Sequence, residues 1–320
     1  MNQINRRKLL KGVGLLTGST LLPFPVTGKS SFKTKTEEKP FKKKFLYCLN
    51  TSTIRGQKLG IEKEIDLAAK AGYDGMEVWI PVLNEYKAGG KSIKDLGKRI
   101  SDKGLKVFDA IGFAPWIHED AQIRAKALDQ AKAEMEMVRE LGCPRIAAPP
   151  AGATDKEISS YDAAAERFRT LIEIGVQQGV IPQLELWGFS KTLYKLSQLL
   201  YVAAQCGHPQ TRLLTDVFHL YKGGSNPDAM KLIAADAIEI FHMNDHLPSS
   251  EMATITDADR VFPGDGSAPL KQLLQDLAKN RDRVILSLEL FNPQYYKMDA
   301  AEVVTTGLAK LKAAVANAAG

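Results

Sequence analysis

The sequence has few residues for covalent or metal cross-links and no long apolar run. Its 320 residues include three cysteines, Cys48, Cys143 and Cys206, which are too few and too scattered for a disulfide framework or a structural zinc site. No apolar run reaches the roughly 18 residues that a membrane-spanning helix needs, which excludes an integral membrane protein. The chain is 44% hydrophobic and 25% charged, an ordinary globular composition that also excludes collagen-like and wholly disordered proteins.

Acidic residues are scarce only at the N-terminus. The formal net charge is +6, but eleven of the 43 Lys and Arg and two of the 37 acidic residues lie in positions 1–44, which leaves 32 basic against 35 acidic residues beyond them. A protein that binds the phosphate backbone needs a basic surface on its folded body. The charge distribution therefore gives no support for a nucleic-acid partner.

Residues 1–28 resemble a twin-arginine export signal. Arg6 and Arg7 precede an apolar stretch at 12–26 that is too short to span a membrane, and small residues follow where a signal peptidase cuts. Residues 29–44 are polar, Lys-rich and without pattern, as in a tether. We predict export to the periplasm, with one folded domain at 45–320; the alternative is a basic tail that contains Arg-Arg by chance.

Eight short apolar segments follow, each rich in Val, Ile, Leu or Phe, as in strands buried on both faces. They are residues 45–50, 75–79, 106–111, 145–148, 181–186, 212–216, 238–243 and 284–290. Stretches with helical spacing lie between most of them, such as 60–71, 121–141 and 161–178. This alternation predicts an α/β fold, a single-domain (β/α)₈ TIM barrel. A Rossmann-type sheet is the second choice, because no G-x-G-x-x-G follows the first strand.

Polar residues stand near the ends of the last four predicted strands. In a TIM barrel the chemistry lies at the C-terminal ends of the strands. Those four strands carry one candidate each, Glu185, Asp216, His242 and Glu289. Burying three carboxylates without compensation would cost several kcal/mol per charge, and a divalent cation would supply the compensation. One imidazole and three carboxylates suit Mn²⁺, our first expectation, or Mg²⁺, Co²⁺ or Zn²⁺.

With these residues in place, the body of the chain resembles the xylose-isomerase-like TIM-barrel superfamily, which includes sugar phosphate isomerases and epimerases. The motifs are LELWG with Glu185, TDVFHLYKGG with Asp216 and His219, FHMND with His242, RVFPGDG with Arg260, and SLELFN with Glu289. The resemblance implies that Glu185, Asp216, His242 and Glu289 bind one divalent metal ion. It also implies that His219 and Arg260 hold substrate oxygens. Trp187 is a further candidate, for stacking on a sugar face.

The resemblance implies a metal-dependent isomerase or epimerase of a sugar or keto-sugar. Glu185 and Glu289 would remove and return a proton through a metal-stabilised enediolate. The same proton removal followed by loss of a β-leaving group would make a lyase or dehydratase of keto-sugars, 3-keto-glycosides or inososes. Ketose 3-epimerases of this group carry another glutamate about six residues beyond the position of Glu185, and residues 187–191 contain no acid. A ketose 3-epimerase is therefore disfavoured.

Two other classes of protein fit the sequence less well. The abasic-site endonucleases of the superfamily use three zinc ions and many histidines, whereas this chain has five histidines. A non-catalytic, exported carbohydrate-binding barrel would have no evident need to bury three carboxylates. We therefore expect a small carbohydrate as the partner. The sequence leaves open which carbohydrate it is, which reaction follows, and whether the protein is a homo-oligomer.

Overall fold

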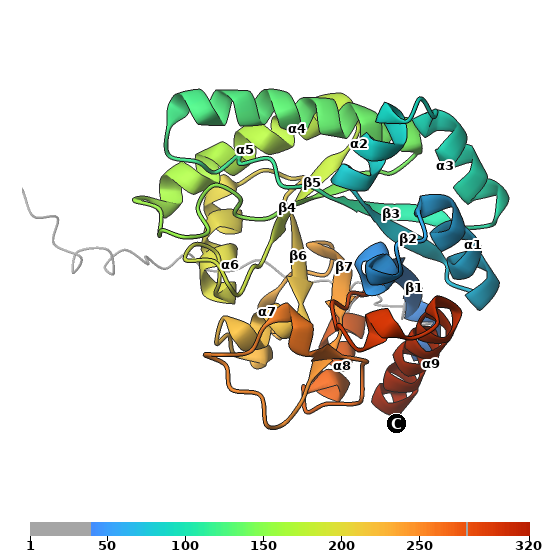
Figure 1. The fold of residues 1–320 in the computed structure, drawn as a ribbon. Coiled ribbons are helices and arrows are strands. Elements are labelled where there is room, and N and C mark those ends of the chain that lie inside the picture. Colours follow the sequence, from blue (N-terminus) through green and yellow to red (C-terminus); the bar gives the residue numbers. More distant parts are fainter. Residues whose placement is uncertain (1–39, 280) are drawn as a thin grey trace, which may run out of the picture. The chain divides into compact units, whose positions relative to one another are not determined.

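The computed structural model describes residues 40–320 except Asn280 (Figure 1). The predicted export signal and residues 29–39 of the predicted tether lie outside the described residues, so export to the periplasm stays a prediction. Phe41–Lys44 forms a short 3₁₀ helix, η1. Its Phe41 ring packs edge-on against the ring of Phe45, with 5.3 Å between the ring centroids. Phe45 is also the first residue of the first strand, where the barrel was predicted to begin.

Eight parallel strands form a nearly closed barrel (Figure 1). They are β1 (Phe45–Asn50), β2 (Gly75–Trp79), β3 (Lys106–Ile111), β4 (Arg145–Ala148), β5 (Ile181–Glu185), β6 (Arg212–Asp216), β7 (Ile238–Met243) and β10 (Val284–Leu288). The order in the sheet is β3-β2-β1-β10-β7-β6-β5-β4, and β3 lies beside β4 without a hydrogen-bonded ladder. The predicted (β/α)₈ barrel is confirmed, although the predicted strands 181–186 and 284–290 end one and two residues earlier than expected.

Helices alternate with the strands and surround them. They are α1 (Ile61–Ala71), α2 (Ile80–Ala88), α3 (Ile93–Asp102), α4 (Ala121–Leu141), α5 (Tyr161–Gln178), α6 (Leu196–Cys206), α7 (Val217–Lys222), α8 (Leu270–Ala278) and α9 (Ala300–Ala319). Short 3₁₀ helices are η2 (Thr51–Gln57), η3 (Pro227–Leu232), η4 (Asp257–Asp259) and η5 (Tyr295–Lys297). Within the described part of the chain, no helix is long and apolar enough to cross a membrane.

The longest helix, α4, shows why these segments are helical. It begins after Asp120, whose carboxylate accepts hydrogen bonds from the backbone N–H groups of Gln122 and Ile123 and so caps the helix. It ends at Gly142, which has a left-handed φ of 88°. Its buried residues recur at helical spacing and form the face that packs on the barrel: Ala127, Ala131, Met135, Val138 and Leu141.

A two-stranded antiparallel hairpin that the sequence did not predict lies after β7. It pairs β8 (Asp245–His246) with β9 (Arg260–Val261). The Asp245 carboxylate accepts hydrogen bonds from the N–H groups of Gly264, at 3.0 Å, and Ala268, at 2.9 Å. Gly264 has a φ of 90°, and a Cβ on Gly266 would lie 2.2 Å from the His246 carbonyl oxygen, so this turn requires glycine at both positions. The hairpin holds Arg260, one of the predicted site residues, in a fixed strand.

Replacing Glu64 by Gln should stabilise the protein at alkaline pH. Glu64 lies on the buried face of α1, and burial raises the pKa of its carboxyl from 4.5 to about 7. Because the folded state holds this proton more tightly than the unfolded state, the free energy of unfolding falls as pH rises from about 4.5 to about 7. We expect Glu64→Gln to raise the free energy of unfolding at pH 8 by about 2 kcal/mol.

Urea unfolding of both proteins at pH 5 and pH 8 tests this expectation. The exposed Glu140→Gln variant on α4 is the control and should match the wild type at both pH values. An equal free energy of unfolding for wild type and Glu64→Gln at pH 8 would contradict the assignment.

Candidate active site

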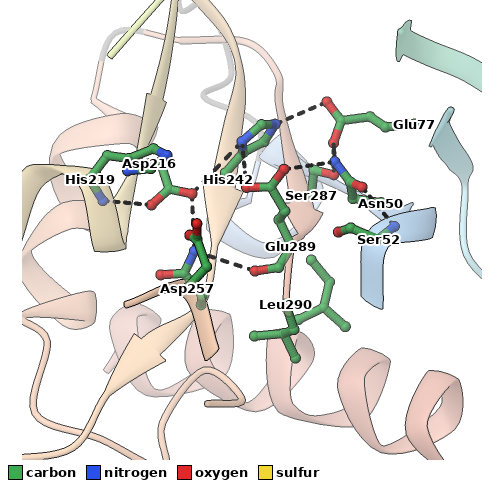
Figure 2. A network of polar contacts seen from close by, with 12 residues as sticks. Asn50, Ser52, Glu77, Asp216, His219, His242, Asp257, Ser287, Glu289 and Leu290 are labelled. Atoms are coloured by element: carbon green, nitrogen blue, oxygen red, sulfur yellow. Dashed lines mark hydrogen bonds and ion pairs between the residues drawn. The ribbon is translucent and has the colours of Figure 1, made fainter. Parts of the chain in front are cut away.

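Three of the predicted site residues meet at the C-terminal end of the barrel (Figure 2). Asp216 ends β6 and pairs with His242 of β7 in the sheet, and His242 pairs with Ser287 of β10. Glu289 stands two residues beyond Ser287, so its side chain leaves the chain on the same side. All three side chains are buried, and one ligand atom from each of Asp216, His242 and Glu289 lies within 4.8 Å of the others.

Asp216 is held as an ionised carboxylate. Its Oδ1 accepts a hydrogen bond from the backbone N–H of His219 at 2.8 Å, which caps α7. Its Oδ2 accepts from Asn244 Nδ2 at 3.0 Å and from Arg260 Nη1 at 2.8 Å. Burial alone would raise the pKa of Asp216, but Arg260, His219 and His242 together lower it to about 2.

The His242 ring lies between carboxylates. Its Nε2 is 3.1 Å from Glu77 Oε1, while its Nδ1 is 3.2 Å from Glu289 Oε2 and 3.8 Å from Asp216 Oδ2. Burial would lower the pKa of His242, but Glu289 and Glu77 raise it well above its ordinary value. Although Nδ1 lies 3.2 Å from Glu289 Oε2, it forms no well-aligned hydrogen bond. It faces the space between the carboxylates of Glu289 and Asp216.

Arg260 supplies positive charge to the same carboxylates. Its guanidinium is 1% exposed, and Nη1 donates to Asp216 Oδ2 at 2.8 Å and to Glu289 Oε2 at 2.9 Å. Its Nη2 lies 2.7 Å from Asp257 Oδ1. The ring of Phe218 lies 4.6 Å from the guanidinium carbon. Arg260 is therefore fully paired inside the site.

His219 is neutral. Its Nε2 lies 3.2 Å from Arg260 Nη2, and since a guanidinium only donates hydrogen bonds, this ring nitrogen accepts and the proton resides on Nδ1. Burial, together with the charge of Arg260, lowers the pKa of His219 to about 4. The two predicted substrate-binding residues are therefore in direct contact with each other.

Glu185 lies on the wall of an adjoining cavity of about 220 Å³, outside the three-residue cluster. Burial raises the pKa of its carboxyl to about 8, although His242 acts in the opposite direction. A cation bound nearby would lower this pKa. The structure therefore places three of the four predicted ligands together and the fourth beside the same opening.

Four large aromatic side chains line part of the cavity. They are Trp79, Phe113, Trp187 and Phe291, and Trp187, a predicted stacking residue, has its ring centroid 6.0 Å from that of Phe113. Arg55 also lines the cavity. A larger cavity of about 570 Å³ opens at the N-terminal ends of the strands, beside Lys106 and Arg145, and includes none of the predicted site residues.

The predicted site residues did not include those that hold His242 and Glu289. Glu77 of β2 is 0% exposed, faces His242 Nε2, and accepts hydrogen bonds from Ser287 Oγ and, at 3.0 Å, from Asn50 Nδ2. Asn50 Nδ2 also donates to Glu289 Oε1 at 3.1 Å (Figure 2). A signal was available: a glutamate between Met76 and Val78, in a strand buried on both faces, requires a buried partner.

These features define a class of protein, a (β/α)₈ barrel with a buried carboxylate–imidazole centre beside a small aromatic cavity at the C-terminal ends of the strands. Residues 65–314 match the family model of the xylose isomerase-like TIM barrel. The chain belongs to this family, as the sequence motifs implied.

Relatives in the family are enzymes of related types. Inosose isomerase from Bacillus velezensis is 28% identical over 273 residues, which cover 84% of this chain and 96% of that protein. Fructoselysine 3-epimerase from Escherichia coli O157:H7 is 25% identical and covers 78% of this chain and 94% of its own length. 3-Dehydroshikimate dehydratase from Pseudomonas putida is 22% identical over 78% of this chain, which corresponds to 39% of that longer protein. The family is thus one of isomerases, epimerases and dehydratases.

Solved structures show the same fold. The IOLI protein with a binding zinc atom superposes with a TM-score of 0.76 at 24% identity and covers 85% of this chain and 98% of its own. D-psicose 3-epimerase, solved in the presence of D-fructose, has a TM-score of 0.68 at 17% identity and covers 86% and 100% of the two chains.

Removing the Arg260 charge should destabilise the protein strongly. Arg260→Met keeps an unbranched apolar stem but leaves Asp216 and Glu289 without this cation. We expect the free energy of unfolding to fall by about 3 kcal/mol in metal-free buffer, because breaking a buried ion pair strands the remaining charges. Asp257→Asn serves as the comparison, because Asp257 is 39% exposed and should cost less than 1 kcal/mol. Equal losses in the two variants by urea unfolding would contradict this account.

Proposed function

We propose that this protein is a divalent-metal-dependent isomerase or epimerase of a sugar or keto-sugar. The observation that carries the proposal is the meeting of His242 Nδ1, Asp216 and Glu289 within 4.8 Å, beside a cavity that also contains Glu185. Lyase or dehydratase chemistry on keto-sugars, 3-keto-glycosides or inososes is the second candidate.

The donor set fits one divalent cation. It offers an imidazole nitrogen without a well-aligned hydrogen bond and two ionisable carboxylates in a buried space. Such mixed nitrogen and oxygen donors suit Mn²⁺, Mg²⁺, Co²⁺ or Zn²⁺, and Glu185 would complete the set from the cavity wall. The zinc atom in the solved IOLI protein supports a divalent ion in this family. Mn²⁺ remains our first expectation.

When bound, the metal would act as a Lewis acid toward oxygens of the substrate. The residues of the chain would do the rest. Glu185 and Glu289 would carry the proton that leaves and returns at the carbon next to a carbonyl group. Of the two predicted substrate-binding residues, His219 would donate a hydrogen bond from Nδ1 to a substrate hydroxyl group. Arg260 would bind a substrate oxygen by exchanging one of its contacts with Asp216, Glu289 or Asp257 for that oxygen. Trp187 and its aromatic neighbours would cover the ring and exclude water.

The dehydratase alternative has support of its own. A relative of the chain is a 3-dehydroshikimate dehydratase, and loss of a β-leaving group begins with the same proton removal. Residues 187–191 contain no acid, whereas ketose 3-epimerases of this group carry a glutamate there. We therefore place inososes and other cyclic ketones ahead of open-chain ketoses as substrates.

Proton NMR in D₂O with inososes, ketoses and 3-keto-glycosides tests the proposal and separates its two forms. Deuterium entering an intact carbon skeleton indicates the isomerase or epimerase. A new alkene or a released leaving group indicates the lyase or dehydratase. The absence of exchange and elimination with every compound, in metal-loaded protein, would overturn both.

Asp216→Asn should abolish metal binding while the fold is kept. The asparagine oxygen can still cap α7, but the negative charge and one anionic ligand are lost. Elemental analysis should find about one divalent ion per wild-type chain and almost none in the variant. Asp257→Asn, which also removes a carboxylate bonded to Arg260, should keep its metal. Three zinc ions per wild-type chain, or equal metal in wild type and Asp216→Asn, would contradict the proposal.

Glu77→Gln should weaken metal binding without removing a ligand. Glu77 accepts from His242 Nε2 and thereby keeps Nδ1 available for a metal. We expect a loss in affinity of about 10- to 100-fold, measured by competition with a coloured chelator. The matched control is Asp109→Asn, because Asp109 is equally buried, its pKa is raised well above the ordinary value by burial, and it bonds Gln183 instead. Unchanged affinity in Glu77→Gln would mean that Glu77 does not orient His242.

A further inference from the structure

Arg55 is held at the edge of the cavity by a rigid 3₁₀ helix. It lies in η2, directly after β1, where Asn50 caps the helix by accepting from Ser52 N–H. Gln57 Nε2 donates to the carbonyl oxygens of Tyr295, at 2.9 Å, and Met298, at 3.2 Å. These bonds fix the backbone on both sides of Arg55 and direct its side chain to the cavity.

The Arg55 guanidinium lies over two aromatic rings. Its central carbon is 5.1 Å from the centroid of Trp79 and 4.8 Å from that of Phe291. The Trp79 ring is itself fixed, because its Nε1 donates to Asn50 Oδ1 at 2.8 Å. Aromatic faces attract a cation, so the two rings hold the guanidinium at the cavity. The guanidinium also lies beside the Tyr296 hydroxyl, where its charge opposes the rise that burial causes in the pKa of Tyr296.

Arg55 also differs in charge pairing from Arg260, the other arginine of the cavity wall. Arg260 pairs with Asp216, Glu289 and Asp257. Arg55 forms no ion pair with any acidic residue that the structure describes, and its side chain is exposed at the cavity. An arginine that lines a cavity and lacks a countercharge is suited to pair with an anionic group of a ligand.

The cavity limits the size and shape of that ligand. Its volume of about 220 Å³ suits one six-membered ring better than a disaccharide. Trp79, Phe113, Trp187 and Phe291 line part of the cavity, and polar residues, among them Glu185, His219 and Glu289, line another part. Such a lining suits a ring that packs its C–H face on the aromatic side chains and turns its hydroxyl groups to the polar ones. A guanidinium edge matches the two oxygens of a carboxylate.

We propose that the substrate is a monocyclic polyhydroxylated ketone that bears a carboxylate, and that Arg55 binds this carboxylate at the mouth of the cavity. The ring chemistry rests on the proposed function, whereas the charge preference rests on Arg55 alone. Arg55 is then a specificity residue that distinguishes a carboxylated ring from the neutral inososes.

Calorimetric titration of the full-length, Mn²⁺-loaded protein with matched ligands tests this preference. 3-Dehydroshikimate and its uncharged methyl ester form one pair, and D-glucuronate and D-glucose form a second. We expect at least one acid to bind about tenfold or more tightly than its neutral counterpart, as one charge-assisted contact provides. Arg55→Gln should remove this ratio and Arg55→Lys should keep part of it. Arg139→Gln, an exposed arginine on α4, should match the wild type.

Three results would overturn the inference. One is that neither acid binds more tightly than its neutral counterpart in the wild type. Another is that Arg55→Gln weakens acid and neutral ligands equally, which would assign Arg55 to ring stacking. The last is tighter binding of fructose 6-phosphate than of either acid, which would assign the arginine to a phosphate.

Metal content and deuterium exchange on the same samples keep the two proposals apart. A metal-loaded protein that exchanges deuterium into inosose but shows no preference for acids overturns only the carboxylate subsite. A protein that prefers the acids in an Arg55-dependent way, but binds no metal and turns over no ring, overturns only the proposed function.

Discussion

The compensation of buried negative charge determines how the C-terminal end of this barrel is built. Glu77, Asp216 and Glu289 are each 4% exposed or less, and an unpaired carboxylate at this depth costs several kcal/mol. The described residues meet that cost with the Arg260 guanidinium and the His242 ring, which are also buried. A divalent cation at His242 Nδ1 would add further positive charge at the point where the carboxylates converge.

Other residues at the C-terminal end of the barrel hold these charged groups in place. Asp216 is fixed because it caps α7, and Arg260 is fixed because the β8–β9 hairpin and the Asp245-bound turn hold its backbone. Asn50 connects the charged centre with the cavity wall, since it bonds Glu289 on one side and the indole of Trp79 on the other. The same residues that neutralise the centre thus also set the position of the surface that a substrate would contact.

Much of this was predictable from the sequence because buried parallel strands are short, apolar and regularly spaced. That pattern located all eight strands and therefore placed Asp216, His242 and Glu289 at one end of the barrel. The pairing of His242 with Glu77 was not predictable, because β2 and β7 lie far apart in the chain and their side-chain directions depend on register. The β8–β9 hairpin has two residues in each strand, too few to give a periodic signal. The position of Arg55 over Trp79 and Phe291 depends on three segments that are far apart in the sequence, η2, the end of β2 and the residues after β10, which local patterns do not relate.

Anomalous X-ray diffraction from crystals grown with Mn²⁺ tests the central claim most directly. The account predicts a single strong anomalous peak within bonding distance of His242 Nδ1 and of carboxylate oxygens from Asp216 and Glu289. A peak elsewhere in the barrel, several peaks in the site, or full Mn²⁺ exposure with no peak and an unchanged Arg260 pairing would contradict it.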